Sequence, residues 1–230
     1  MEPVHIQTSD ASLAADLTIR PDCEGLVIFA HGSGSGRHSS RNRYVASVLV
    51  RFGLGTLLLD LLTEEEEVID RRTMAYRFDV EFLARRLAGA TGWATRQPTT
   101  AHLGIGYFGA STGAAAALIA ASQEAQMVQA VVSRGGRPDL AGAAVLRNVR
   151  APTLLIVGGD DTDVLKLNQE AEHHLEAHHE LNVVQGATHL FEERGALAEV
   201  SSLAGKWFRR YLKRTDRKDT NGIKPQRVSE

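Results

Sequence analysis

The sequence has very little cysteine and no strong charge of either sign. Cys23 is the only cysteine among 230 residues, so no disulfide can form within the chain, which fits a reducing compartment. The 26 basic and 28 acidic residues leave a formal net charge of -2. A chain without an excess of positive charge does not attract the phosphate backbone of a nucleic acid, so no nucleic-acid partner is expected.

Long apolar runs are also missing. No stretch approaches the roughly 20 apolar residues that a membrane helix needs. The opening segment MEPVHIQTSDASLAADL lacks the basic and then apolar pattern of a signal peptide. We therefore expect a soluble, cytoplasmic protein with no membrane partner.

What the sequence does contain is a regular alternation of strand-like and helical patterns. This alternation predicts an α/β fold, with a mostly parallel twisted sheet of about eight strands, helices on both faces and no large cap domain. Strands are expected at 4–7, 14–19, 26–30, 56–59, 102–106, 130–133, 153–157 and 181–184. Helices are expected at 42–52, 77–87, 111–123, 164–177 and 193–212.

The ends of the pattern set the expected domain limits. Residues 1–212 are predicted to form a single domain, and the polar segment 213–230 a disordered tail. The acidic run at 64–67 is interpreted as a solvated loop or a first helical turn.

The segment HLGIGYFGASTGAAAAL, residues 102–118, contains the motif G-x-S-x-G around Ser111. A predicted strand precedes the motif and a predicted helix follows it, which is the context of a nucleophile elbow. The sharp turn strains the serine, and glycines at 109 and 113 avoid collisions with the backbone. The alternative is a glycine-rich helix start with an N-capping serine. The strand-turn-helix context favours Ser111 as a nucleophile.

The loop HGSGSG at 31–36 follows the apolar strand LVIFA. Its backbone is expected to help form an oxyanion hole, from the N–H of Thr112 and one N–H from Ser33 or Gly34. A phosphate cradle is the competing interpretation, but the loop lacks the G-K-[ST] ending and does not fit G-x-G-x-x-G. His31 is interpreted as structural, because it stands where the loop leaves the sheet.

An acid and a base are expected after the serine, at the ends of later strands. In this fold the chain order is nucleophile, acid, histidine. The loop GGDDTDV favours Asp161 as the acid, and the loop GATHLF favours His189 as the base. Three other acids stay open as candidates: Asp160, Asp163, which is expected to cap the next helix, and Asp139.

At these residues the chain resembles the α/β-hydrolase superfamily and, within it, dienelactone-hydrolase-like serine hydrolases. The resemblance covers about residues 24–212 and rests on HGSGSGRHSSRN, GASTG, VGGDDTDV and GATHLF. It implies a triad of Ser111, Asp161 and His189 and no cofactor. Dienelactone hydrolases use a cysteine nucleophile, where this chain has serine. General cleavage of a small ester, thioester or lactone through an acyl-enzyme on Ser111 is therefore expected, rather than cleavage of dienelactone itself.

Two further features bear on ligand binding. Arg41 belongs to a basic cluster beside the glycine loop, and Arg134 and Arg137 follow a neighbouring strand. Arg41 is a candidate ligand for an anionic substrate group, with plain surface charge as the alternative. His174 and His178 are spaced to share one face of an exposed helix, but no third ligand accompanies them, so no metal site is expected.

Other functions remain open at this point. A fold does not establish an activity, so a non-catalytic ligand-binding scaffold is one alternative. An acyltransferase that uses the same triad is another. The expected partner is a small-molecule substrate, and the sequence leaves a homo-oligomer open.

Overall fold

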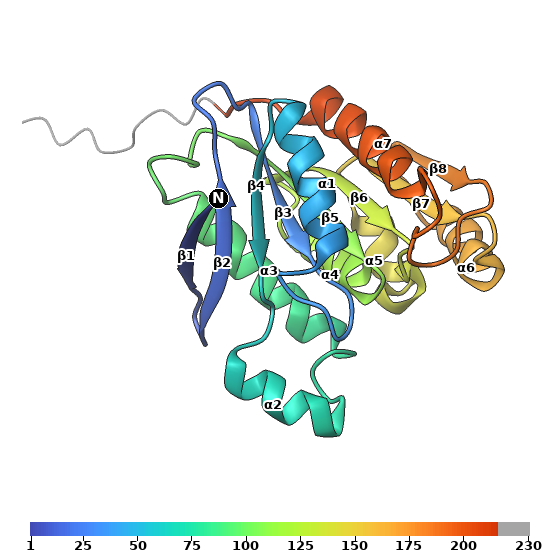
Figure 1. The fold of residues 1–230 in the computed structure, drawn as a ribbon, viewed down its shortest axis with the longest axis horizontal. Coiled ribbons are helices and arrows are strands. Elements are labelled where there is room, and N and C mark those ends of the chain that lie inside the picture. The colour runs from blue at the N-terminus through green and yellow to red at the C-terminus, as the bar shows by residue number, and fades with distance from the viewer. Residues whose placement is uncertain (216–230) are drawn as a thin grey trace, which may run out of the picture.

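The computed structural model describes residues 1–215 and builds them around one eight-stranded sheet (Figure 1). The strands are β1 (Glu2–Gln7), β2 (Ser12–Thr18), β3 (Gly25–Ala30), β4 (Gly55–Leu59), β5 (Gly104–Ala110), β6 (Val128–Arg134), β7 (Thr153–Gly158) and β8 (His179–Val184). Their order is β1-β2-β4-β3-β5-β6-β7-β8. The pairs β1–β2 and β2–β4 are antiparallel, and all pairs from β4 to β8 are parallel. The predicted sheet is confirmed.

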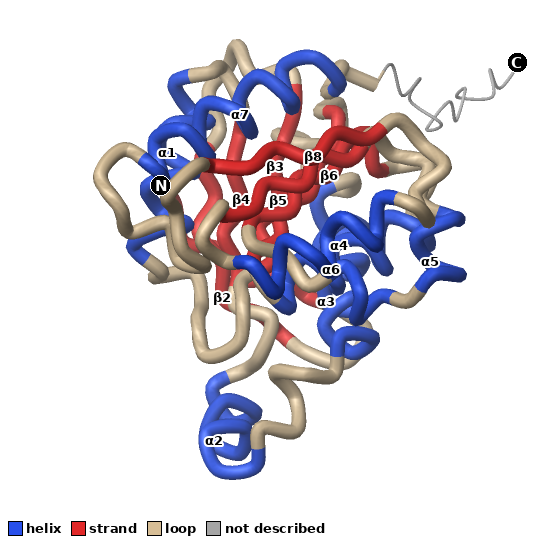
Figure 2. Tube along the Cα trace, turned by 90° about the vertical axis from the view of Figure 1, so that its right-hand side faces the viewer, coloured by secondary structure: helices blue, strands red, loops and turns tan. Residues whose placement is uncertain are grey.

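Helices connect the strands and cover both faces of the sheet. They are α1 (Ser40–Arg51), α2 (Glu64–Thr73), α3 (Val80–Ala94), α4 (Thr112–Gln123), α5 (Ala143–Asn148), α6 (Thr162–Glu172) and α7 (Ala196–Tyr211), with the short 3-10 helix η1 (Pro138–Ala141) before α5. Helices α1 and α7 pack on one face, and α3, α4, α5 and α6 on the other (Figure 2). This confirms the predicted α/β layering.

Strand β3 shows how the sequence fills both layers. Leu26 and Ile28 face the core beneath α3 and α4, while Val27 and Phe29 face the core beneath α1 and α7. Successive side chains of a strand point to opposite faces, so a strand covered on both sides must be apolar throughout. The parallel strands end at one edge of the sheet, and the loops that leave this edge carry the candidate site.

Helix α2 is longer than the sequence pattern indicated. The acidic run at 64–67 is its first turn, one of the two outcomes expected. The Thr63 hydroxyl accepts the Glu66 N–H and the Glu66 carboxylate accepts the Thr63 N–H, which is a capping box. Carboxylates in a first turn also face the positive end of the helix. These local interactions explain why such a polar segment is helical.

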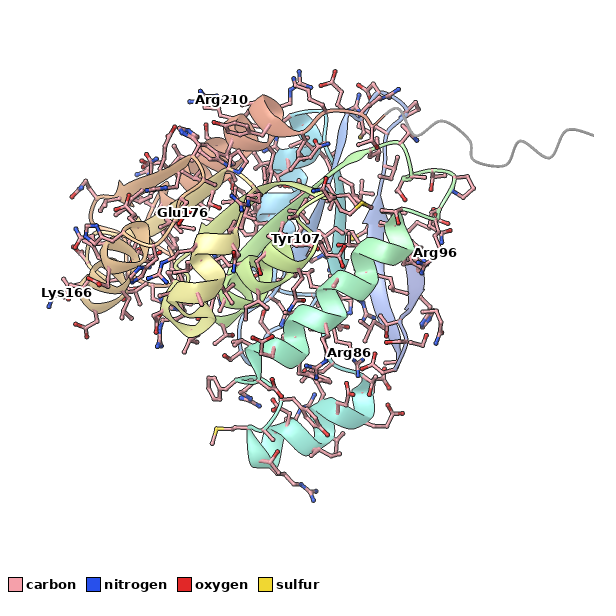
Figure 3. All side chains as sticks on the ribbon, turned by 180° about the vertical axis from the view of Figure 1, so that it is seen from behind. Arg86, Arg96, Tyr107, Lys166, Glu176 and Arg210 are labelled. Carbon is pink, nitrogen blue, oxygen red and sulfur yellow. The ribbon has the colours of Figure 1, made fainter. Side chains whose placement is uncertain are left out.

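Helix α2 stands apart from the sheet (Figures 1 and 2). Charged side chains link it to α3. Arg86 on α3 is buried between that helix and α2 (Figure 3). Its guanidinium lies 2.6 Å from Glu66 on α2 and 3.1 Å from Asp10 in the β1–β2 turn. Near the other end of α2, Asp70 pairs with Arg77 at 2.6 Å. Arg86 therefore fixes the start of α2 against α3, while the Asp70–Arg77 pair orders the segment that leads from α2 to α3.

Several other elements have limits different from those predicted, and three of them illustrate why. Helix α3 spans Val80–Ala94 instead of 77–87, and it begins at Val80 because the Asp79 carboxylate caps it by accepting the Phe82 N–H. Strand β5 runs from Gly104 to Ala110 instead of 102–106, since its glycines obscured the strand pattern. Helix α6 spans Thr162–Glu172 instead of 164–177. The predicted polar helix around His174 and His178 is therefore wrong, and these residues do not share a helix face.

The predicted tail falls mostly outside the described residues. Residues 216–230 lie beyond the described range, so the predicted disorder there stays a prediction. The tail's first residues do contact the domain: the Lys213 N–H donates to Gln129, and the Arg214 guanidinium donates to the Cys23 carbonyl. Among residues 1–215, no helix combines the length and apolarity needed to cross a membrane.

Candidate active site

Ser111 occupies the sharp turn between β5 and α4. Its backbone has φ 52° and ψ -123°, a region that residues other than glycine rarely adopt and that costs about 1–3 kcal/mol. A Cβ at Gly109 would lie 2.4 Å from the Ala114 Cα, and one at Gly113 would lie 2.3 Å from the Ala30 carbonyl oxygen. The glycines on either side are therefore required by close packing, as the motif predicted.

The structure brings Ser111, His189 and Asp161 into one hydrogen-bonded chain. The Ser111 Oγ lies 3.3 Å from the His189 Nε2, and the His189 Nδ1 lies 2.6 Å from the Asp161 Oδ2. Because an ionised carboxylate only accepts, Nδ1 is the donor in the second contact, which leaves Nε2 to accept the serine proton. The Asp161 side chain is 15% exposed and the His189 side chain 38% exposed. The arrangement can remove a proton from Ser111.

Asp161 lies in the short loop after β7, three residues beyond Gly158 and immediately before α6. It is the N-cap residue of α6, yet its side chain makes no capping hydrogen bond and turns to His189 instead. Asp163 lies inside the first turn of α6, so its predicted role as the cap is wrong. Asp160 is exposed, and Asp139 pairs with Arg137 at 2.7 Å. Of the four acids considered, Asp161 is the one in contact with His189.

The glycine loop after β3 lies against the start of α4, beside Ser111. The Ser35 N–H donates to the Gly32 carbonyl, which closes a turn that has Gly34 at φ 66°. Ser33 contacts Thr112 twice, through its N–H at 3.1 Å and its hydroxyl at 3.0 Å from the Thr112 Oγ1. The expected oxyanion donors are thus neighbours, but the Ser33 N–H already has an acceptor from within the chain.

His31 joins this loop to the one that follows β4. Its Nε2 accepts the Leu61 N–H at 3.0 Å, and its Nδ1 donates to the Gly32 carbonyl at 3.0 Å. Burial, the largest cause, lowers the pKa of His31, so the neutral ring is favoured. The side chain is a bridge between two loops and does not contact Ser111.

A small cavity of about 190 Å³ opens at Ser111. It is lined by Gly32, Ser33, Ser35, Ser39, Arg41, Ser111, Arg134, His189 and Leu190. A neighbouring cavity of about 370 Å³ extends from the same glycine loop toward α2. No group of three or more His, Cys, Asp or Glu side chains within residues 1–215 is arranged to hold a metal ion.

Two arginines line the small cavity. Arg41, in the first turn of α1, donates to Glu192 at 2.8 Å. Arg134, the last residue of β6, is buried, and no carboxylate among the described residues pairs with it. Sequence reasoning singled out Arg41 and placed Arg134 only at a strand end. The available signal was a charged residue that closes a mostly apolar strand, VQAVVSR.

Known proteins match this chain along most of its length. The model of the dienelactone hydrolase family matches residues 17–213. The crystal structure of a dienelactone hydrolase from Anabaena variabilis is 54% identical, with a TM-score of 0.91 over 92% of this chain and 98% of that one. Est1E from Butyrivibrio proteoclasticus is 14% identical, with a TM-score of 0.75 over 90% of this chain and 98% of that one, which shows the fold alone.

The curated relatives are longer proteins. Two strains of Mycobacterium tuberculosis carry a protein named "Putative phosphoribosyl transferase" that is 56% identical over 207 residues. The match covers 90% of this chain but 46% of that protein. The chain therefore spans about half the length of the curated relatives it matches.

Proposed function

The chain belongs to the dienelactone hydrolase family, and we propose that it is a serine hydrolase that cleaves a small ester, thioester or lactone. The observation that carries the proposal is the hydrogen-bonded chain from Ser111 through His189 to Asp161. A neutral serine is a weak nucleophile and needs a base within reach, which itself needs a partner to orient it. The contacts that His189 makes with Ser111 and Asp161 support both roles.

The proposed reaction proceeds through an acyl-enzyme. The Ser111 Oγ attacks the substrate carbonyl carbon while its proton passes to the His189 Nε2, and Asp161 stabilises the resulting imidazolium. The tetrahedral intermediate then collapses, the bond to the leaving group breaks, and the leaving group takes the proton from His189. Water repeats the sequence on the acyl-serine, which releases the acid and restores Ser111.

The oxyanion is proposed to form at the start of α4. The Thr112 N–H lies at the positive end of this helix, where backbone donors favour a developing negative charge. The second donor is proposed to be the Ser33 N–H, with the Gly34 N–H as the alternative. When substrate binds, the Ser33 N–H would leave the Thr112 hydroxyl and donate to the substrate oxygen instead. Losing one such donor slows turnover by about 10²- to 10³-fold in serine hydrolases.

Cys23 does not replace the serine as nucleophile. Its thiol is buried and accepts the Arg20 N–H at 3.3 Å. It precedes β3, whereas Ser111 follows β5, and these strands are parallel. The two residues therefore lie at opposite edges of the sheet. We retain a small-molecule substrate and a cytoplasmic location as proposals that rest on the small cavity and the single cysteine.

The name of the mycobacterial relatives describes a different chemistry. Phosphoribosyl transfer is stated of proteins of which this chain covers 46%. This chain itself has a dienelactone-hydrolase-type fold and the serine turn. We propose that the transferase name refers to the part of those relatives that this chain does not match.

An activity-based probe tests the proposed function. A fluorophosphonate is expected to label the purified protein at Ser111, and the protein is expected to hydrolyse p-nitrophenyl acetate. Ser111→Ala should abolish both. Ser122→Ala is the matched control, because Ser122 lies near the other end of α4 and, within residues 1–215, its hydroxyl bonds only to the Ile119 carbonyl. A folded protein that shows neither labelling nor hydrolysis would favour the non-catalytic scaffold.

The acyltransferase alternative needs a separate measurement. Hydrolysis is followed with and without an added alcohol or thiol, and the products are identified by mass spectrometry. A hydrolase releases mainly the free acid. A dominant acyl-acceptor product at modest acceptor concentration would instead favour acyl transfer.

A further inference from the structure

Helix α2 and the segment after it expose a cluster of apolar side chains. Val68 is 55% exposed and Ile69 is 47% exposed, and Met74 and Phe78, which follow the helix, are 54% and 56% exposed. The other large hydrophobic side chains that are exposed within residues 1–215 are spread along the chain, at positions 1, 44, 140 and 190. Single exposed apolar side chains are normal, whereas a group of them marks an interaction surface.

The inner side of α2 is occupied within the molecule. Asp70 is buried and pairs with Arg77, while Glu66 pairs with Arg86 of α3. Asp70 and Glu67 also line the cavity of about 370 Å³ that extends from the glycine loop. The helix projects from the body of the molecule (Figures 1 and 2). Its outer side is therefore available to a partner.

Opposite charges flank the apolar centre of this outer side. Residues three, four and seven positions apart lie on the same side of a helix. One such stripe on α2 consists of Glu65, Val68, Ile69 and Arg72. Glu65 stands three residues before Val68, and Arg72 stands three residues after Ile69. Neither Glu65 nor Arg72 forms an ion pair with another residue of the described part of the chain. The stripe therefore has a negative end, an apolar middle and a positive end.

We propose that α2 is the contact surface of a homodimer, in which the α2 helices of two copies pair antiparallel about a two-fold axis. In a two-fold interface the same surface meets itself, so each contact occurs twice. A pairing centred between Val68 and Ile69 places Glu65 of each copy opposite Arg72 of the partner subunit and buries the apolar middle. A parallel pairing would instead place like charges opposite each other, which is unfavourable. The stripe is thus complementary to itself, which favours a second copy of this chain as the partner.

The end of the chain is a poorer candidate to cover this surface. Ile223 and Val228 are the only large hydrophobic residues in 216–230. The last described residues contact Gln129 and Cys23, whereas α2 lies at the other end of the molecule (Figure 1). A second copy therefore remains the better partner.

The proposed interface is small and separate from the candidate active site. Helix α2 has 10 residues, and interfaces below about 1,200 Å² in total are typical of transient complexes. We therefore expect a reversible dimer that dissociates on dilution through the micromolar range. No residue of α2 lines the cavity at Ser111, so the inference is independent of the proposed hydrolase function.

Sedimentation velocity of the full chain, from micromolar to submillimolar concentration, tests the proposal. The wild-type protein is expected to shift from monomer to dimer, and Ile69→Lys should stay monomeric. A lysine four residues after Glu65 supports the helix, so loss of the dimer would not reflect loss of α2. Leu140→Lys is the matched control, because Leu140 is an exposed apolar residue of η1 and its variant should dimerise like the wild type. A wild-type protein that stays monomeric, or a dimer that Ile69→Lys leaves unchanged, would overturn the proposal.

Charge reversals test the antiparallel pairing itself. Glu65→Lys or Arg72→Glu alone places like charges opposite each other in its homodimer, so the dissociation constant should rise about 10-fold, because two surface ion pairs are lost and two repulsions replace them. A mixture of the two variants restores opposite charges at both contacts, so mixed dimers should form where neither variant dimerises alone. The double variant Glu65→Lys/Arg72→Glu should dimerise like the wild type. Such rescue could not occur if the single substitutions unfolded α2. If neither the mixture nor the double variant recovers the dimer, the proposed pairing is wrong.

Vesicles of phosphatidylcholine and phosphatidylglycerol test a membrane surface as the alternative partner. The wild-type protein is expected not to sediment with them, because the acidic run at 64–67 places negative charge beside the apolar residues and repels anionic lipid. Sedimentation of the wild type but not of Ile69→Lys with the vesicles, together with a monomer in solution, would overturn the homodimer in favour of the membrane.

Discussion

Gly158 at the end of β7 packs directly against the backbone of Ala187, which precedes His189. A Cβ on Gly158 would lie 2.2 Å from the Ala187 carbonyl oxygen and 2.7 Å from that of Thr188. The Asp160 N–H also donates to the Ala187 carbonyl at 3.0 Å. This close approach of two loops lets the Asp161 carboxylate reach the His189 ring.

Gly158→Ala is expected to push these loops apart. Overpacking of this kind costs about 1–3 kcal/mol, so the melting temperature should fall. The kcat for p-nitrophenyl acetate should fall as well, because the Asp161–His189 contact lengthens. Gly159→Ala is the control, since a Cβ there meets its nearest atoms at an ordinary 3.4 Å. Equal effects of the two substitutions would contradict this explanation.

Asp161→Asn is expected to lower kcat by up to about 10⁴-fold, because the amide no longer selects the required tautomer of His189. The fold should be retained, as judged by circular dichroism, since the side chain does not cap α6. Asp160→Asn and Asp163→Asn are the matched controls and should change kcat less than 10-fold, because an exposed carboxylate that does not touch the base has little to contribute. A larger effect at either control would mean that the acid is misassigned.

Ser111→Gly separates backbone strain from chemistry. Glycine adopts φ 52° and ψ -123° freely, so the substitution should raise the free energy of unfolding by about 1 kcal/mol while abolishing hydrolysis. Ser111→Ala removes the hydroxyl but retains the Cβ, so it should abolish hydrolysis without the gain in stability. Urea denaturation measures the difference. Similar unfolding free energies for the two variants would argue that this turn is not strained.

His31 should make the stability of the protein depend on pH. Burial lowers its pKa in the folded state below the ordinary 6.5. Its contribution to stability is therefore complete above the unfolded pKa and is lost as the pH falls from there through the folded pKa, because the unfolded chain then binds a proton that the folded ring does not. In His31→Gln the unfolding free energy should decline less between neutral and mildly acidic pH. An unchanged slope in urea denaturation would show that other groups dominate.

Much of the fold followed from local pattern. Apolar runs such as LVIFA alternate with segments that have the apolar periodicity of a helix, which predicted a parallel sheet covered on both sides. A strand buried on both faces has to be apolar throughout. The limits of α2 and α3 were missed, although the Thr63–Glu66 capping box and the capping Asp79 are local signals that the sequence contains. Strand β5 was shortened because its glycines weakened the strand pattern.

The sequence by itself determined the turn at Ser111 and the chain order of serine, aspartate and histidine. Both can be recognised locally, because the turn requires glycines at fixed positions and each strand has its own apolar pattern. Only the tertiary structure decided which aspartate contacts His189. Asp161 and His189 are 28 residues apart, and the acids next to Asp161 differ from it mainly in where their side chains point. The same holds for the Ser33–Thr112 contact and for Arg134. A cation is unpaired only if every distant segment that packs around it fails to supply a carboxylate, and that depends on how the strands and helices assemble.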